Sequence, residues 1–436
     1  MHVVFITPKF IPNLETGGAA IYNQVAIEYL IENGHQVTLI HFDALQYNVI
    51  YPEAATVLEN MGVRLVSFTQ PVSHRVKEGF ISQPTESDIF PHILLRDQVS
   101  SFLRESKPDL IFAYGDGAMA PVKDVSDIPV IVQLGDPMHL IQLIRWQYDY
   151  LYNYPFGFNM DTLKWGMRIF NSLRRDMPSM LFYPHHLKMI LKNISCSVTV
   201  CPQHIERYEK LTGTNCYFTP IPLEDSIGPD WATKRKQIRA EKRSKVKLLW
   251  VGKPANTENR YAVRFLVREL FPELVKLIPL DSFELHVVGD DRNCPPELTQ
   301  LAQKYPNLYI RGHVHDIDSE WLSADVYVVT NTTTVGARTR ILSSFSGGNC
   351  VVAHIANTAG IPALKDGENI LIGKNGREMA QQIYKAIQDN ALREKLGKNG
   401  RQVYKTYYEK SVAAQFLMSI FQKTVEEFHL ANGARA

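Results

Sequence analysis

The sequence predicts an α/β protein of two doubly wound domains in tandem, and three observations support this. Short apolar runs typical of buried strands alternate with stretches of helical periodicity along most of the chain. The chain has 436 residues, whereas a single hydrophobic core usually stops growing at about 250 to 300 residues. A polar, basic stretch near the middle separates two such series. We therefore expect two sheets of parallel strands, each covered by helices.

The composition excludes several other classes of protein. Hydrophobic residues make up 45% and charged residues 21%, which excludes a disordered or fibrous chain. The 47 Lys and Arg residues nearly balance the 45 Asp and Glu residues, so we expect no nucleic-acid partner. The five cysteines form no C-x-x-C pair, and the chain start lacks a basic leader segment. We expect a cytoplasmic protein, with peripheral contact to the inner face of a membrane as a further expectation.

The first domain is expected over residues 1–225. The apolar run at 2–7 predicts a buried strand, the Gly17-Gly18 loop follows it, and a helical stretch then leads to a second strand at 36–42. Further strands are predicted at 108–114, 128–134 and 196–202. Residues 138–194 interrupt this alternation with a segment rich in aromatic and basic residues, for which we expect a helical insertion.

A second domain is expected over residues 247–405, after a solvated basic linker at 226–246. Residues 406–436 predict a C-terminal helix that packs back toward the first domain. Strands of the second domain are predicted at 247–252, 283–289, 307–312, 326–331 and 350–355.

The carboxyl edges of the two sheets are the expected binding site. Ligands of open α/β sheets bind beyond the carboxyl ends of the strands, so we expect the two domains to face each other across a cleft that holds the ligand. In the first domain, the small residues Gly17 and Gly18 would let backbone N–H groups approach an anion or a sugar. A tight turn that binds no ligand would have the same sequence.

The second domain carries the sharper group of candidate residues. Gly336, Ala337 and the pair Arg338 and Arg340 follow the strand at 326–331 and surround the expected start of a helix. A helix N-terminus with arginines beside it favours a diphosphate. Lys253, which follows the first strand of this domain, adds a cation at the same edge. The alternative to a diphosphate site is that these three cationic side chains are solvated or paired with surface acids.

The order of these elements and several strings resemble the GT-B glycosyltransferases, specifically glycosyltransferase family 4. The likeness covers nearly the whole chain and is carried by LLWVGK, FELHVVGDD, SADVYVV, GARTRIL and AGIPALKDGENILI in the second half. It implies two Rossmann-like domains and a retaining, hexosyltransferase-type enzyme of polysaccharide biosynthesis (EC 2.4 class). The donor would be a nucleotide-sugar and the acceptor a carbohydrate or a lipid-linked glycan. No cofactor and no metal are expected.

The resemblance also implies roles for individual residues. Asp136, Lys253 and Arg340 would be catalytic, and Lys253 and Arg340 would also bind the donor. The other substrate-binding residues implied are Gly17, Gly18, Arg260, Gly336, Ala337, Arg338 and Ser343.

The chain departs from the family pattern at three places. The two glutamates of the E-x7-E motif would fall at Val335 and Ser343, so both are absent. Asn259 stands where relatives have Lys, although Arg260 is adjacent, and Gly135 stands where many have His. Two alternatives to an active transferase therefore stay open. One is a catalytically impaired GT-B protein that binds a nucleotide, a glycan or a protein partner, and the other is a nucleotide-sugar epimerase.

Overall fold

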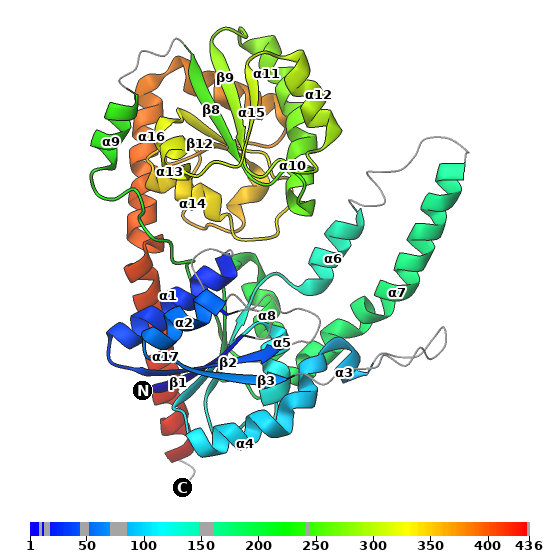
Figure 1. The fold of residues 1–436 in the computed structure, drawn as a ribbon, viewed down its shortest axis with the longest axis vertical. Helices are drawn as coiled ribbons and strands as arrows, with labels where there is room; N and C mark the ends of the chain where they lie inside the picture. The colour runs from blue at the N-terminus through cyan, green and yellow to red at the C-terminus, as the bar shows by residue number, and fades with distance from the viewer. Residues whose placement is uncertain are drawn as a thin grey trace. The chain divides into compact units, whose positions relative to one another are not determined.

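The computed structural model describes residues 1–7, 11–12, 18–43, 52–69, 85–147, 160–239 and 245–433. The chain divides into two compact units. Unit 1 comprises Met1–Pro222 and Ala413–Ala436, and unit 2 comprises Leu223–Val412. Each unit is built on its own sheet with helices packed on it (Figure 1).

Unit 1 contains a seven-stranded parallel sheet in the order β3-β2-β1-β4-β5-β6-β7. Its strands are β1 (His2–Thr7), β2 (Gln36–Asp43), β3 (Arg64–Thr69), β4 (Leu110–Tyr114), β5 (Val130–Leu134), β6 (Cys196–Thr199) and β7 (Cys216–Phe218). All five residues of β5 are buried, as expected for a central strand covered by helices on both faces.

The helices of unit 1 come mostly from between its strands. They are α1 (Gly18–Glu32), α2 (Pro52–Asn60), α3 (Glu86–Ile89), α4 (Arg96–Ser106), α5 (Asp116–Met119), α6 (Met138–Trp146), α7 (Met160–Ile190) and α8 (Ile205–Thr212). The last helix of the chain, α17 (Lys410–Gly433), completes this unit. Phe421 of α17 packs against Phe5 of β1 and Phe112 of β4, with ring centroids 6.3 and 5.1 Å apart. The end of the chain therefore belongs to the core formed by its beginning.

Unit 2 contains a six-stranded parallel sheet in the order β10-β9-β8-β11-β12-β13. Its strands are β8 (Val246–Val251), β9 (Phe283–Val288), β10 (Leu308–Gly312), β11 (Val326–Val329), β12 (Cys350–His354) and β13 (Leu371–Gly373). Its helices are α9 (Trp231–Ile238), α10 (Thr257–Phe265), α11 (Phe271–Leu277), α12 (Pro296–Lys304), α13 (Ile317–Ser323), α14 (Thr339–Ser346), α15 (Gly376–Gln388) and α16 (Asn390–Val403).

Residues 226–246 were expected to form a solvated basic linker, but part of this stretch forms a helix of unit 2. Its helix α9 packs on unit 2, where Trp231 fills the space beside Gly348, and a Cβ built at Gly348 would lie only 2.1 Å from the indole. Arg235 is 5% exposed and donates hydrogen bonds to the carbonyl of Gly347 (2.6 Å) and to Oδ1 of Asn349 (2.9 Å). The basic composition predicted a solvated side chain here. Arg235 is buried instead, because carbonyl groups just before β12 accept its hydrogen bonds. Residues 240–244 lie outside the described residues.

The predicted fold class, two parallel-sheet α/β domains, is confirmed. Three strands, β3, β7 and β13, were not predicted from the sequence. In β3, an edge strand, no residue is buried, while β7 and β13 have three residues each. Such strands leave too short or too mixed a hydrophobic signal to be recognised. No helix in the described ranges is long and apolar enough to cross a bilayer.

Candidate functional site

The strand order of unit 2 marks one place where a ligand would bind. From β8 the chain moves to β9 and β10 on one side of the sheet, and then returns to β11 on the other side of β8. The order in which the chain adds strands therefore reverses between β8 and β11, although all the strands are parallel. In doubly wound sheets the loops diverge at this switch point and leave a crevice at the carboxyl ends of the strands.

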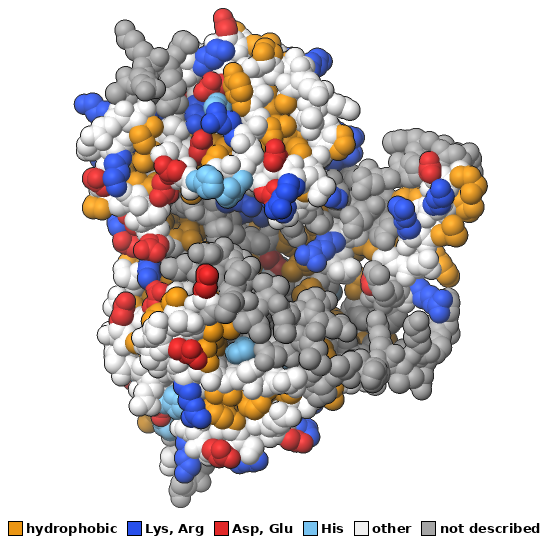
Figure 2. Space-filling view, in the orientation of Figure 1, with side chains coloured by type: hydrophobic (Ala, Val, Ile, Leu, Met, Phe, Trp, Pro, Cys, Tyr) orange, Lys and Arg blue, Asp and Glu red, His pale blue; other side chains and the backbone are white. Residues whose placement is uncertain are grey.

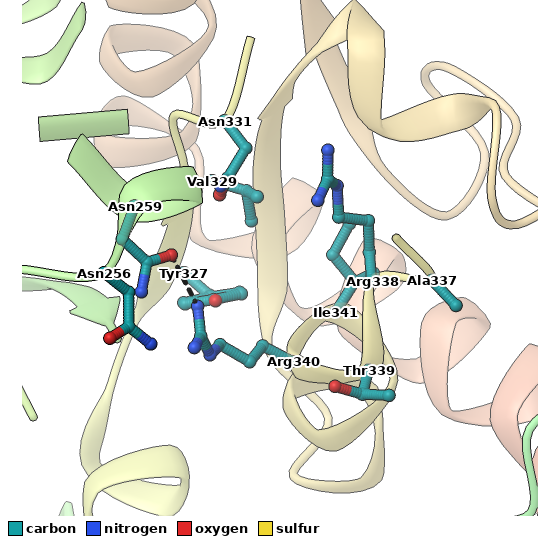
Figure 3. A pocket seen from close by; sticks show the side chains of 10 residues that line it. All are labelled: Asn256, Asn259, Tyr327, Val329, Asn331, Ala337, Arg338, Thr339, Arg340 and Ile341. Carbon is teal, nitrogen blue, oxygen red and sulfur yellow. Dashed lines mark hydrogen bonds between the residues drawn. The ribbon is translucent and has the colours of Figure 1, made fainter. Parts of the chain in front are cut away.

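A cavity of about 200 Å³ lies at this edge of the sheet (Figure 3). Asn256 and Asn259 line it from the start of α10, and Tyr327 lines it from β11. Ala337, Arg338 and Arg340 line it from the start of α14. Most of these groups are polar or cationic, so the cavity suits an anionic, hydrogen-bonding ligand.

Arg340 is one of two arginines that line this cavity. Its Nη1 donates a hydrogen bond to Oδ1 of Asn259 at 3.1 Å, and Nδ2 of Asn259 donates to the carbonyl of Lys253 at 2.8 Å. Asn259 is 4% exposed, so the amide is fixed between its two partners. A chain of hydrogen bonds thus links the loop after β8 to the guanidinium at the start of α14.

Gly252 makes room for this arrangement. A Cβ at this position would lie 3.0 Å from Nη1 of Arg340 and 3.1 Å from Nδ2 of Asn259. Gly289, with φ +140°, lies against the backbone of Gly252, and a Cβ there would come within 2.0 Å of the Gly252 carbonyl oxygen. Two glycines therefore allow the loops after β8 and β9 to meet closely beneath the arginine.

Arg338 has a different role from Arg340. Its Nη2 donates a hydrogen bond to the carbonyl of Thr333. Gly336 between them has φ +83°, a conformation that glycine adopts readily. The two guanidinium groups point in different directions in Figure 3. Arg338 therefore closes the loop between β11 and α14, in addition to lining the cavity.

Tyr327 lies beside both arginines. Its side chain is 2% exposed, and this burial raises the pKa of the phenol to about 12, against the opposing effect of the positive charges of Arg340 and Arg338. The phenol is thus neutral at physiological pH. It provides a neutral wall to the cavity next to the cationic start of α14.

Lys253 lies at the same edge but is engaged with an acid. Its Nζ is 2.8 Å from Oδ2 of Asp290, in the loop after β9, and the side chain is 42% exposed. Arg292 pairs with the same carboxylate at 2.7 Å. Hydrogen bonds from Arg292 and then from Lys253 hold the pKa of Asp290 well below its usual range. Lys253 is therefore accessible to a ligand that competes with Asp290.

The remaining expected residues of unit 2 fall around the cavity. Ser343 lies in α14 and Arg260 in α10, both half-buried, and neither is among the described residues that line the cavity. Gly360 lies against the Gly336–Arg338 loop, where a Cβ would be 3.2 Å from the Gly336 carbonyl oxygen. Val335, at the first position of the absent glutamate pair, is 6% exposed.

The expected residues of unit 1 are described separately. Asp136 follows β5, and its Oδ1 lies 3.0 Å from Nε2 of His204, with both side chains buried. Tyr208 donates a hydrogen bond to the carbonyl of Gly135 at 2.6 Å. Gly18 is the first residue of α1, and Gly17 lies outside the described residues. The pairing of Asp136 with a histidine was not foreseen in the sequence.

Asn256, Asn259 and Tyr327 also line the cavity, although the sequence did not single them out as site residues. One signal was present, since Asn259 stands where the resembled family usually has Lys. Within the described ranges, no group of three or more His, Cys, Asp or Glu side chains is placed to hold a metal ion.

Comparison with known proteins gives a family match for part of the chain. Residues 245–389 match the family model described as glycosyl transferases group 1. These residues include β8 to β13 and every residue that lines the cavity. No curated protein sequence matches the chain.

Solved structures share the fold over nearly the full chain. A sucrose-phosphate synthase from Thermosynechococcus elongatus superposes with a TM-score of 0.65 at 15% identity, covering 97% of this chain and 98% of that one. HepE from Anabaena, in complex with UDP, gives 0.61 at 15% identity over 97% and 100%. The glycosyltransferase WaaG, involved in lipopolysaccharide biosynthesis, gives 0.57 at 15% identity over 95% and 99%. At these identities the likeness concerns the fold alone.

Proposed function

We propose that this chain is a retaining glycosyltransferase that transfers a hexose-type sugar from a nucleotide-sugar to a carbohydrate or lipid-linked glycan acceptor. The observation that carries the proposal is Arg340, which Asn259 holds in a polar cavity at the switch point of unit 2. The family match covers this cavity. The structural neighbour HepE has been solved in complex with UDP and with UDP-glucose.

The chemistry of transfer explains why cations are needed here. The bond between the anomeric carbon and the β-phosphate oxygen breaks, and the electron pair stays on the departing diphosphate. The oxygen of the acceptor hydroxyl bonds to the anomeric carbon, and the hydroxyl proton passes to the departing diphosphate. The developing negative charge is the main obstacle, and fixed positive groups lower that barrier. Arg340 and the N-terminus of α14 would bind the diphosphate.

Lys253 would join this group by exchanging partners. A diphosphate carries more negative charge than the Asp290 carboxylate, so the exposed ammonium would turn from Asp290 toward it. Gly336 and Ala337 would offer backbone atoms to the same ligand, and Arg338 would hold their loop in place. Asp136 of unit 1, which is paired with His204, would be a further catalytic residue.

A binding assay tests the donor. The full chain is heated with UDP-, GDP-, ADP-, TDP- and CMP-sugars, and the unfolding temperature is recorded. A donor at about a hundredfold over its Kd should add about 2.7 kcal/mol of stability. If none of these nucleotide-sugars raises the unfolding temperature, the proposal is wrong. A donor that binds is then incubated with candidate acceptors, and the anomeric configuration of the product is read by NMR.

A second function has support from the missing carboxylates. Val335 and Ser343 occupy the positions of the paired glutamates, so no carboxylate stands there to bind the donor. A protein that binds a nucleotide or glycan without catalysis would show the thermal shift but neither transfer nor hydrolysis of the sugar. The same wild-type protein therefore separates the two functions in these assays.

A further inference from the structure

Helix α7 of unit 1 exposes a long apolar stripe. Six large apolar side chains in the part of the helix up to Leu181 are between 45% and 69% exposed: Met160, Leu163, Met167, Phe170, Met177 and Leu181. The intervals between them are three, four, three, seven and four residues, which place all six on one face of the helix. Large apolar side chains gathered in this way mark an interaction surface.

The stripe is not the face by which α7 joins its own unit. Tyr183, Leu187 and Ile190, near the end of the helix, belong to the core of unit 1. By contrast, no residue of α7 from 160 to 171 is buried, and no residue of α6 is buried. Figure 1 shows the first half of α7 projecting away from the sheet of unit 1. The fold therefore supports the helix at one end and leaves its apolar face outside the core.

The charges beside the stripe are basic. Lys164 and Arg168 are exposed and follow each other at one flank of the stripe, four residues apart, and Arg174 is exposed within it. The sequence of α7 has five Lys or Arg residues and two Asp residues. Figure 2 shows hydrophobic and basic side chains side by side on this helix. An apolar face with basic side chains at its margin is typical of helices that lie in the interface of an anionic bilayer.

We propose that α7 binds the surface of an anionic lipid bilayer, with its apolar stripe in the interfacial layer and its basic residues on the lipid headgroups. The stripe spans 22 residues, or about 33 Å of helix, so several side chains enter the interface together. Each adjacent Lys or Arg contributes further attraction to anionic lipids. This proposal does not depend on the glycosyltransferase function.

Arg174 favours lipid over a second copy of the chain as the occupant. It lies seven residues after Met167 and seven before Leu181, hence in the middle of the apolar seam. A helix packed on this seam would take the guanidinium out of water, and removing a cation from water is costly. At a bilayer surface the long side chain reaches the phosphate groups while its stem stays among apolar groups.

Vesicle flotation with the full chain tests the proposal. The chain is expected to float with vesicles of phosphatidylcholine and phosphatidylglycerol and to stay behind with phosphatidylcholine alone. The double variant Leu163→Glu and Leu181→Glu should weaken this binding by at least about tenfold, since both side chains leave the interface. Leu430→Glu, a matched change at a 74% exposed leucine of α17, should leave binding unchanged.

A second pair of variants isolates the charges. Lys164→Gln with Arg168→Gln should weaken binding to the anionic vesicles about tenfold, and Lys395→Gln with Lys398→Gln, exposed on α16, should not. Raising the salt from about 0.1 to about 1 M shortens the screening length from about 10 to about 3 Å and should reduce binding of the wild type.

Three results would overturn the proposal. One is the absence of flotation with anionic vesicles, and another is an equal loss of flotation in Leu430→Glu. The third is a dimer, seen by light scattering, that the α7 variants dissociate, because a second copy would then cover the stripe. Nucleotide-sugar thermal shifts of the same variants are expected to match the wild type, so a failed donor assay and a failed vesicle assay remain distinguishable.

Discussion

Arg340 and Asn259 form a hydrogen bond of 3.1 Å between two helices, although the two residues are 81 positions apart in sequence. Both side chains line the cavity at the switch point of unit 2. The bond fixes one nitrogen of the guanidinium and leaves the rest of the fork for a ligand. Its consequences for binding and stability can be tested by substitution.

Replacing Arg340 should weaken donor binding. In Arg340→Ala the affinity for the stabilising nucleotide-sugar should fall about tenfold to a hundredfold, because charge-assisted hydrogen bonds to the diphosphate are lost. Calorimetric titration measures this. Arg174→Ala, a change at an exposed arginine of unit 1, is the control. Equal losses in both variants would contradict the assignment of the diphosphate to the start of α14.

A methyl group at Gly252 should act through Arg340. In Gly252→Ala the new Cβ would meet Nη1 of Arg340 at 3.0 Å and Nδ2 of Asn259 at 3.1 Å, so both side chains must shift. We expect donor affinity to fall several-fold, while the chain still folds. Gly433→Ala, at a glycine with no atom within 4 Å of its Cβ position, serves as control. Unchanged affinity in Gly252→Ala would mean that the position of the guanidinium does not matter for binding.

Asp225 should give unit 2 a stability that depends on pH. Burial alone would raise its pKa, but hydrogen bonds from Arg401, the Gly228 N–H and Lys405, with the charge of Arg401, hold the pKa below the usual value. The ion pair with Arg401 measures 2.7 Å, and both side chains are at most 10% exposed. The carboxylate therefore stabilises the fold above its ordinary pKa of about 3.9, and this contribution is lost as the pH falls through the lowered value.

Urea unfolding of Asp225→Asn checks this sign. The free energy of unfolding at pH 7 should fall by about 3 kcal/mol, because Arg401 is left buried with its charge unpaired. The difference from wild type should shrink as the pH falls through the lowered pKa of Asp225, where the wild-type carboxylate becomes protonated. Asp281→Asn, at an exposed residue, should change little at either pH. A difference that does not vary with pH would contradict the role of the carboxylate charge.

Arg235 should stabilise unit 2 although it lies in a basic, polar segment. In Arg235→Met the Gly347 carbonyl and the fully buried Asn349 lose their donor, which should cost about 2 to 4 kcal/mol of unfolding free energy. Lys236→Met, at the next residue of α9, changes an exposed cation and should cost little. Similar costs for the two variants would indicate that the residues act through charge alone.

Much of the fold could be read from hydrophobic periodicity. The central strands β1, β4, β5 and β8 are mostly apolar, because both faces of a covered parallel sheet are buried. The edge strand β3 and the three-residue strands β7 and β13 could not be read in this way. Their pairing depends on neighbouring strands that bring the partner backbone to them, and not on their own composition.

The candidate site could be read in part. Residues that follow a strand directly, such as Lys253, or that begin a helix, such as Arg340, are placed at the carboxyl edge by connectivity alone. The contact between Asn259 and Arg340 could not be predicted, because side-chain contacts between distant elements leave no local pattern. For the same reason, the hydrogen bond from Arg338 to the Thr333 carbonyl in its own loop could not be predicted, although Arg338 lines the cavity as expected of a residue at this edge.

The amino-acid sequence by itself determined the class of fold, the two-part series of strands and helices, and the cationic start of α14, since each follows from short-range periodicity and residue type. Only the tertiary structure decided that Asn259 bonds Arg340 in the cavity, that Asp136 pairs with His204, and that Arg235 is buried. Those outcomes depend on which backbone carbonyls and side chains meet across tens or hundreds of residues. Packing of the whole unit decides which groups meet, and no single segment holds that information.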